Sequence, residues 1–226
     1  MTDFTRSIPS LALILMSVCP AYAQAPGPTM APIEQYMMAS QSDEIALARS
    51  AAPASISDHA EVLTLASRGY ETAAKGKNGF VCIVERAWAS EYDNVEFWNP
   101  RVRAPFCYNA AAARSVLPAY LRRTGWALSG ASRAEMLDRT KAAIAAKEIT
   151  APEIGAMAYM MSKNGYLSDA DGHWHPHLMF FLPRTEAAAW GANLPGVPMI
   201  GGGGDLEPVS AFLAAVPNWS DGTSSR

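Results

Sequence analysis

Three of the four histidines in the chain stand close together, as His173, His175 and His177 in the segment GHWHPHLMFF. Alternate residues of an extended strand share one face, so a strand over 173–182 would point all three imidazoles to one side and Trp174 to the other. Pro176 favours extended backbone at the residue before it, which supports this geometry. Imidazole is a common ligand of zinc and copper, so the spacing predicts a transition-metal site.

Two other interpretations of the histidines remain open. The imidazoles could bind a small polar ligand, or they could be buried and bond backbone carbonyls. His-x-His also begins the metal motif of cupins, but there a glutamate follows within a few residues, whereas here the next carboxylate is Glu186. Asp169, Asp171 and Met179 lie near enough in the sequence to supply further oxygen or sulfur ligands.

A hydrolase is the second hypothesis for function. The chain has neither the G-x-S-x-G nor the S-x-x-K pattern of nucleophilic hydrolases. A Ser–His–Asp set could still assemble in space, for example from Ser162 or Ser168, one of the histidines as base, and Asp171. Such an enzyme would act on cell-envelope material. A structural or interaction protein without any site is the third hypothesis, so enzymatic activity is left open.

The charge balance argues against a nucleic-acid partner. The chain has 226 residues, with 18 Lys and Arg against 21 Asp and Glu, so no basic excess exists to neutralise phosphates. Half of the residues are hydrophobic and 17% are charged, a composition that favours a folded protein over a disordered one. The length fits a single domain.

The N-terminus has the pattern of a signal peptide over residues 1–23. Arg6 precedes the apolar run IPSLALILMSV, and Ala21 and Ala23 form an A-x-A cleavage site. The run is too short to cross a bilayer, and no other segment is long enough, so we expect no membrane span after cleavage. The pattern predicts export to the periplasm or the extracellular space. A buried N-terminal helix and a lipid anchor at Cys19 are the alternatives.

Export changes what the cysteines indicate. Only Cys82 and Cys107 remain after the predicted cleavage, and an even pair in an oxidising compartment is typical of a structural disulfide. We expect residues 24–32 to form a flexible lead-in, 33–219 a single globular domain, and 220–226 a polar tail.

The remaining pattern predicts an α+β domain with a mainly antiparallel sheet flanked by helices. One helix is expected to start at Ser42 and another at the capping box formed by Ser132 and Glu135. Strands are expected over 61–66, 80–88, 155–163, 173–182 and 209–216. Residues 91–108 and the glycine run 201–204 are expected to be irregular. The charged pair Glu85–Arg86, which follows an apolar run, is expected to reach solvent, with a pocket-lining role as the alternative.

Several longer segments show a family resemblance. GKNGFVCIVERAW, EFWNP, APFCYNAAAARSVLP, GHWHPHLMFF and WGANLPG resemble segments of a family of exported bacterial proteins with no assigned activity. The resemblance covers most of the chain after the predicted cleavage site. It implies export and a single domain, and it carries over no activity, cofactor or catalytic residue.

Overall fold

The computed structural model describes residues 29–172, 174–204 and 206–225. The expected signal peptide, most of the expected lead-in and His173 therefore lie outside the described residues. Within the described ranges, no helix combines the length and apolar character needed to cross a bilayer.

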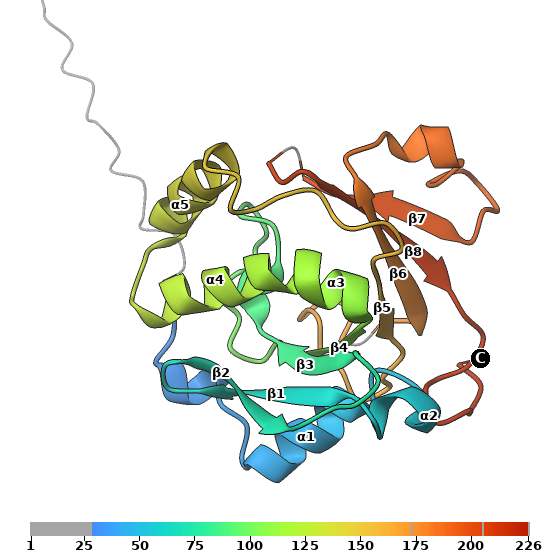
Figure 1. Cartoon of the computed structure of the whole chain (residues 1–226), viewed down its shortest axis with the longest axis horizontal. Coiled ribbons are helices and arrows are strands. Elements are labelled where there is room, and N and C mark those ends of the chain that lie inside the picture. Colours follow the sequence, from blue (N-terminus) through green and yellow to red (C-terminus); the bar gives the residue numbers. More distant parts are fainter. Residues whose placement is uncertain (1–28, 173, 205, 226) are drawn as a thin grey trace, which may run out of the picture.

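One mixed sheet organises the chain (Figure 1). It has eight strands in the order β2-β1-β3-β4-β5-β6-β8-β7. Neighbours are antiparallel except β1 and β3, so the expected α+β class with a mainly antiparallel sheet is confirmed. The strands are β1 (Glu61–Ala66), β2 (Gly69–Ala74), β3 (Val81–Glu85), β4 (Ala104–Tyr108), β5 (Met157–Met160), β6 (His177–Pro183), β7 (Met199–Gly202) and β8 (Val209–Ala215).

Helices pack on both faces of this sheet, as Figure 1 shows. One face carries the helices at residues 41–49 and 54–57, and the other carries the three helices within residues 110–145. The helices are η1 (Ile33–Tyr36), α1 (Gln41–Arg49), α2 (Ala54–Ser57), η2 (Ala87–Ala89), α3 (Ala110–Ser115), α4 (Leu117–Leu128), α5 (Arg133–Ala145) and η3 (Ala187–Trp190).

The central strands separate two hydrophobic clusters. Successive residues of a strand point to opposite faces, and both faces of β3 and β4 are buried. Cys82, Val84 and Cys107 belong to the smaller cluster, on the face of α1. Ile83 and Phe106 belong to the larger cluster, on the face of α3 and α4. A strand buried on both faces explains the uninterrupted apolar run at this point of the sequence.

Helix starts follow the polar residues that cap them. In α5 the Ser132 hydroxyl accepts from the backbone N–H of Glu135 at 3.2 Å, and the Glu135 carboxylate accepts from the backbone N–H of Ser132 at 2.8 Å, so the expected capping box is confirmed. Helix α1 begins earlier than expected. Its cap is Ser40 and not Ser42, because the Ser40 hydroxyl accepts from the N–H of Asp43.

Two segments expected to be irregular contain strands. The expectation for residues 91–108 is wrong at its end, where β4 lies in the middle of the sheet. This strand was not expected because it contains Pro105, and proline is rare in central strands. Proline is tolerated here because β5 pairs only with Cys107 and Tyr108, so Pro105 needs no N–H to bond to β5. The glycine run is not all loop either, because Gly201 and Gly202 belong to β7. Strand β2 also has no counterpart in the expected elements.

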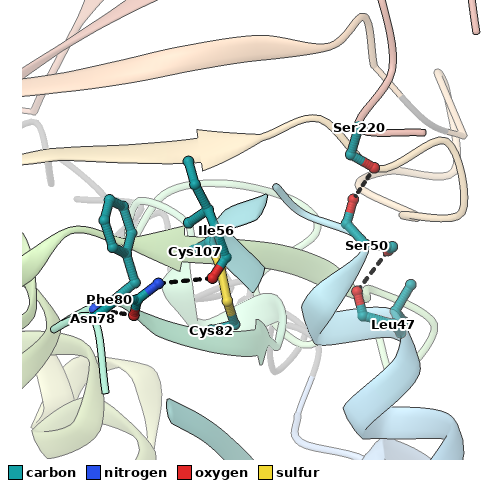
Figure 2. The surroundings of a disulfide bond; sticks show 8 residues. All are labelled: Leu47, Ser50, Ile56, Asn78, Phe80, Cys82, Cys107 and Ser220. Carbon is teal, nitrogen blue, oxygen red and sulfur yellow. Dashed lines mark hydrogen bonds between the residues drawn. A yellow bond between two sulfur atoms is a disulfide. The ribbon is translucent and has the colours of Figure 1, made fainter. Parts of the chain in front are cut away.

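The disulfide between Cys82 and Cys107 is confirmed. The two cysteines are directly opposite each other in the β3–β4 ladder, with Cα atoms 4.0 Å apart, and both are fully buried. Figure 2 shows the bond beside Ile56 and Phe80. The Asn78 side chain donates to the carbonyl of Ile56 at 2.8 Å, which joins α2 to the turn before β3.

The expected polar tail is attached to the rest of the domain. Ser220 donates through its hydroxyl to the carbonyl of Ser50 at 2.6 Å (Figure 2), and through its backbone N–H to the carbonyl of Met161 at 3.0 Å. An isolated bridge between Asn218 and Ser224 closes the segment on itself. The end of the chain thus lies between the C-terminal end of α1 and the end of β5.

Candidate functional site

The strand that carries the histidines is shorter than expected. Strand β6 begins at His177, not at residue 173, so the expected strand over 173–182 is wrong at its start. Ser168 and Asp171 close a tight turn just before it, in which the Asp171 N–H donates to the Ser168 hydroxyl at 2.9 Å. Pro176 has no N–H to add to a ladder, which explains why pairing begins only after it.

His177 is buried, with 4% of its surface exposed. Its Nδ1 lies 2.7 Å from the carbonyl oxygen of His175. A carbonyl only accepts hydrogen bonds, so Nδ1 carries the proton and Nε2 carries a lone pair. Nε2 is buried and has no hydrogen-bond partner among the described residues. Burial lowers the pKa of His177 from 6.5, so the ring is neutral at pH 7.

A small pocket surrounds this side chain, and we call it the His177 pocket. Its volume is about 10 Å³, which leaves room for about one water molecule. The ring of Trp174 meets the ring of His177 edge to face, with centroids 5.4 Å apart. Trp174 therefore lies on the same side as His177, whereas strict alternation along a strand would place it on the opposite side. The lining residues are Pro105, Met160, Ser162, Gly165, Leu167, Trp174, His175 and His177.

Met160 reaches the pocket from the neighbouring strand. It is the register partner of His177 in the β5–β6 ladder, and directly paired residues place their side chains on the same face. The pocket is thus lined by His177 at the start of β6, by His175 just before it, and by Met160 from β5. Nothing in the sequence near the histidines indicates Met160, because only the strand register brings it to the site.

The serine of the pocket is already bonded. Ser50 donates its hydroxyl proton to the carbonyl of Leu47 at 2.6 Å, so in the 2.6 Å contact between Ser50 and Ser162 the donor is Ser162. Ser162 also accepts from the N–H of Asn164 at 3.1 Å. The proton that a histidine base would remove from Ser162 therefore points to Ser50. This geometry gives the hydrolase hypothesis no support.

The other residues considered as ligands lie in separate arrangements. Asp169 accepts from Asn99 at 2.8 Å and from the Tyr166 hydroxyl at 2.6 Å, and Asp171 is bonded within its own turn. Met179 packs against the larger hydrophobic cluster. The described residues contain no group of three or more His, Cys, Asp and Glu able to hold a metal ion. His173 lies outside them, so the predicted three-histidine set remains a prediction.

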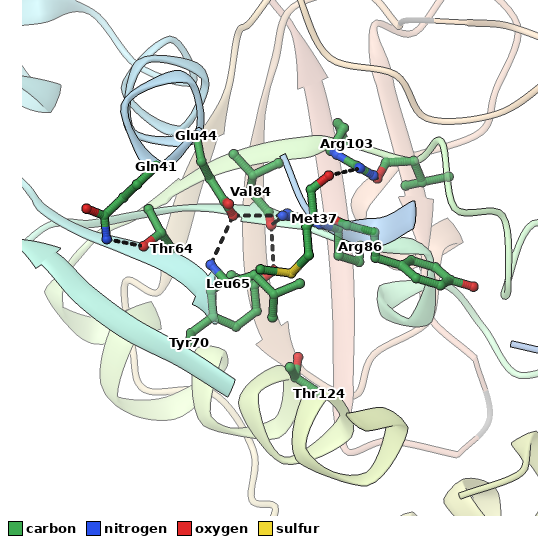
Figure 3. Close-up of polar contacts among 12 residues, drawn as sticks. Met37, Gln41, Glu44, Thr64, Leu65, Tyr70, Val84, Arg86, Arg103 and Thr124 are labelled. Atoms are coloured by element: carbon green, nitrogen blue, oxygen red, sulfur yellow. Dashed lines mark hydrogen bonds and ion pairs between the residues drawn. The ribbon is translucent and has the colours of Figure 1, made fainter. Parts of the chain in front are cut away.

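A second concentration of titratable groups lies in the core. The expectation that Glu85 and Arg86 reach solvent is wrong, because their exposed fractions are 4% and 0%. The strand end is covered by η1, α1 and α4, which contribute Tyr36, Glu44 and Tyr120 respectively as hydrogen-bond partners of Arg86. Arg86 donates to the Glu44 carboxylate at 2.8 Å, as Figure 3 shows. It also donates to the carbonyl of Tyr36 at 2.7 Å.

Glu85 lies on the opposite side of this strand end. Its carboxylate accepts from the Tyr108 hydroxyl at 2.5 Å. Burial raises the pKa of Glu85 to about 7, while the Tyr108 hydrogen bond and the charge of Arg123 partly offset this effect. Burial raises the pKa of Tyr120 as well, whose hydroxyl accepts from the backbone N–H of Arg86 at 2.8 Å. These groups hydrogen-bond one another and the neighbouring backbone inside the packed core.

No protein-family model, curated protein or solved structure matches this chain. Function is therefore inferred from the geometry of the His177 pocket.

Proposed function

We propose that the protein is an exported metal-binding protein whose site is the His177 pocket. The observation that carries the proposal is the buried lone pair of His177 Nε2, which has no hydrogen-bond partner among the described residues. Leaving a buried polar atom unpaired costs about 1–3 kcal/mol, so the arrangement favours a bound metal ion that accepts the lone pair of Nε2. Histidines that bind metals commonly donate their other ring N–H to a carbonyl, as His177 does to His175.

The donors around the lone pair favour copper. Met160 supplies a thioether and His175 a second imidazole, and soft sulfur together with imidazole is a ligand set that suits copper(I). The volume of about 10 Å³ fits a guest the size of one atom and not an organic molecule. His173, the neighbour of Trp174 in the sequence, is the third imidazole expected to join the site.

Export is part of the same proposal. It rests on the signal-peptide pattern over residues 1–23 and on the disulfide, which suits an oxidising compartment. In such a compartment a protein that takes up copper or zinc would meet its metal outside the cytoplasm.

The first prediction concerns metal content. Protein purified without a histidine tag and reconstituted with copper(I) should hold about one equivalent, since an assembled site retains its metal. His177→Ala should weaken the affinity more than about tenfold, because it removes the central donor. A competition titration against a chromophoric copper(I) chelator measures both values, and zinc is tested in parallel.

His59→Ala is the matched control. His59 is the one described histidine that lies outside the pocket, on an exposed position before β1, so its removal should leave metal binding unchanged. Met160→Leu keeps the shape of the side chain and removes the sulfur, and it should weaken copper more than zinc. Less than about one-tenth of an equivalent of either metal in the wild-type protein contradicts the proposal, and so does equal loss in the His59 and His177 variants.

A further inference from the structure

The outer edge of the sheet carries a segment that has exposed apolar side chains and no charged residue of its own. Residues 187–204 contain no Asp, Glu, Lys or Arg, and they form η3, the connection to β7, and β7 itself. Figure 1 shows these elements at the edge of the molecule, away from α4 and α5. We call the exposed hydrophobic side chains of this segment the apolar tip: Trp190, Leu194, Val197 and Ile200, with exposed fractions of 52%, 54%, 39% and 48%.

The backbone of this segment is bonded within itself. The Asn193 side chain donates to the carbonyl of Gly201 at 2.9 Å and accepts from the N–H of Gly201 at 3.0 Å. The Asn193 N–H also donates to the carbonyl of Met199 at 3.0 Å. Asn193 has a left-handed backbone with φ of 63°, a conformation that asparagine tolerates better than most residues. The carbonyl of Met199 and both backbone polar groups of Gly201 are thus bonded to Asn193.

This arrangement argues against a second copy of the chain as the partner. Asn193 occupies the edge of β7 at which another strand would pair. The four side chains of the apolar tip expose on the order of 100 Å² each. Their summed exposed area is well short of the roughly 800 Å² that each partner buries in a stable dimer. The segment also offers no charge to complement a partner's charge.

The same arrangement suits a lipid surface. Backbone groups that are satisfied internally can enter an apolar medium without a large cost. Tryptophan with aliphatic neighbours and no charge is the side-chain set that enters the boundary between headgroups and acyl chains. We propose that the apolar tip inserts shallowly into a lipid surface. No basic cluster accompanies it, so apolar burial drives the binding and salt has little effect on it.

The experiment measures binding to vesicles of pure phosphatidylcholine by co-sedimentation at low and high salt. The protein should sediment with the vesicles, with partition coefficients that agree within about twofold between the two salt concentrations. The double variant Leu194→Ser with Val197→Ser should lower the partition coefficient at least about tenfold, because it removes two apolar anchors. Both side chains are exposed, so the substitutions leave the core intact.

The matched control is Val95→Ser with Ile154→Ser, which removes two exposed hydrophobic side chains elsewhere on the molecule. It should bind vesicles as the wild-type protein does. Trp190 reports the depth of insertion, because brominated lipids should quench the fluorescence of the wild-type protein more than that of Trp190→Phe. Absence of sedimentation, equal loss in the control, or a concentration-dependent dimer that only the Leu194/Val197 variant abolishes would overturn the proposal.

Discussion

Glu85 illustrates how a single residue makes stability depend on pH. Its carboxyl group is buried beside Tyr108, and its pKa rises from 4.5 to about 7. In the unfolded chain the group ionises near its ordinary pKa, while in the folded protein it keeps its proton up to about pH 7. The folded state therefore binds more protons between these values, and its stability falls as the pH rises through this window.

A comparison of the wild-type protein with Glu85→Gln tests this pH dependence. The free energy of unfolding of the wild-type protein should fall by about 3 kcal/mol relative to the variant between pH 4.5 and pH 7, since one pKa unit corresponds to about 1.4 kcal/mol. Urea titrations at several pH values measure this difference. Glutamine keeps an oxygen that accepts from Tyr108 but has no proton to lose.

Comparison with the variant is needed because His177 changes the free energy of unfolding with pH in the opposite direction to Glu85. Burial lowers the pKa of His177, so the unfolded chain binds the extra proton below pH 6.5 and stability is lost as the pH falls. This contribution is common to both proteins and cancels in the difference. Parallel curves for the two proteins would contradict the role given to Glu85.

The candidate site could be predicted in part from its residues. The spacing of the histidines led to His175 and His177, which do line one pocket. The sequence pattern could not reveal that Pro176 delays the strand, nor that Met160 faces His177, because that contact depends on the register between β5 and β6. The burial of Glu85 and Arg86 was missed because their partners Glu44 and Tyr108 are distant in the sequence.

Among the elements, the connection between β2 and β3 has little room for a side chain. A Cβ atom at Gly76 would lie 2.1 Å from the backbone nitrogen of Glu61 and 2.7 Å from the carbonyl carbon of Ala60. Both atoms belong to backbone that enters β1, where the Glu61 N–H donates to the carbonyl of Phe80. A methyl group at position 76 therefore has to displace the first residue of a central strand.

Gly76→Ala should lower the free energy of unfolding by at least about 1–3 kcal/mol, the usual cost of forcing extra volume into a packed region. Gly125→Ala is the matched control. Gly125 is exposed within α4 and a Cβ atom there meets nothing within 4 Å, so alanine should stabilise the protein by about 1 kcal/mol. Thermal and urea unfolding of both variants test the pair, and a Gly76 variant as stable as the wild type would refute the steric account.

Helices and strands were predicted correctly where the signal for them lies in neighbouring residues of the sequence. The capping box of α5 and the alternation of β1 are written in neighbouring residues, and both were found. Strand β4 was missed because Pro105 argues locally against a strand, while its pairing with β3 is a long-range property. Strand β7 was missed because its glycines resemble a loop; Gly201 is required there, since a Cβ atom would lie 2.8 Å from Ala187 and 2.9 Å from Phe212.

At the scale of the whole molecule, the disulfide joins two strands that are 25 residues apart in the sequence. Closing a loop of this length stabilises a protein by about 3 kcal/mol in the chain-entropy description. The double variant Cys82→Ala with Cys107→Ala should lose about this amount, and a reductant should destabilise the wild-type protein to a similar extent while leaving the variant unaffected. Equal sensitivity of both proteins to the reductant would show that the bond does not contribute.

The fold class was within reach of the sequence, but the strand order was not. Interspersed helix and strand signals with Asn-Gly turns led to an α+β domain with a mainly antiparallel sheet, which the structure has. The parallel pair β1–β3 and the placement of β8 between β6 and β7 depend on contacts between distant segments. Such pairings leave no mark on local hydrophobic periodicity.

The attachment of Ser220 has a consequence for the order in which the protein assembles. Ser220 bonds Ser50, and the Ser50 hydroxyl in turn holds Ser162 at the wall of the His177 pocket. Ser50 and Ser220 are 170 residues apart in the sequence, so their hydrogen bond closes a long loop whose entropy must be lost before the contact forms. The contact of Ser50 with Ser220 is therefore expected to form late in folding, after the contacts within the helices and between neighbouring strands.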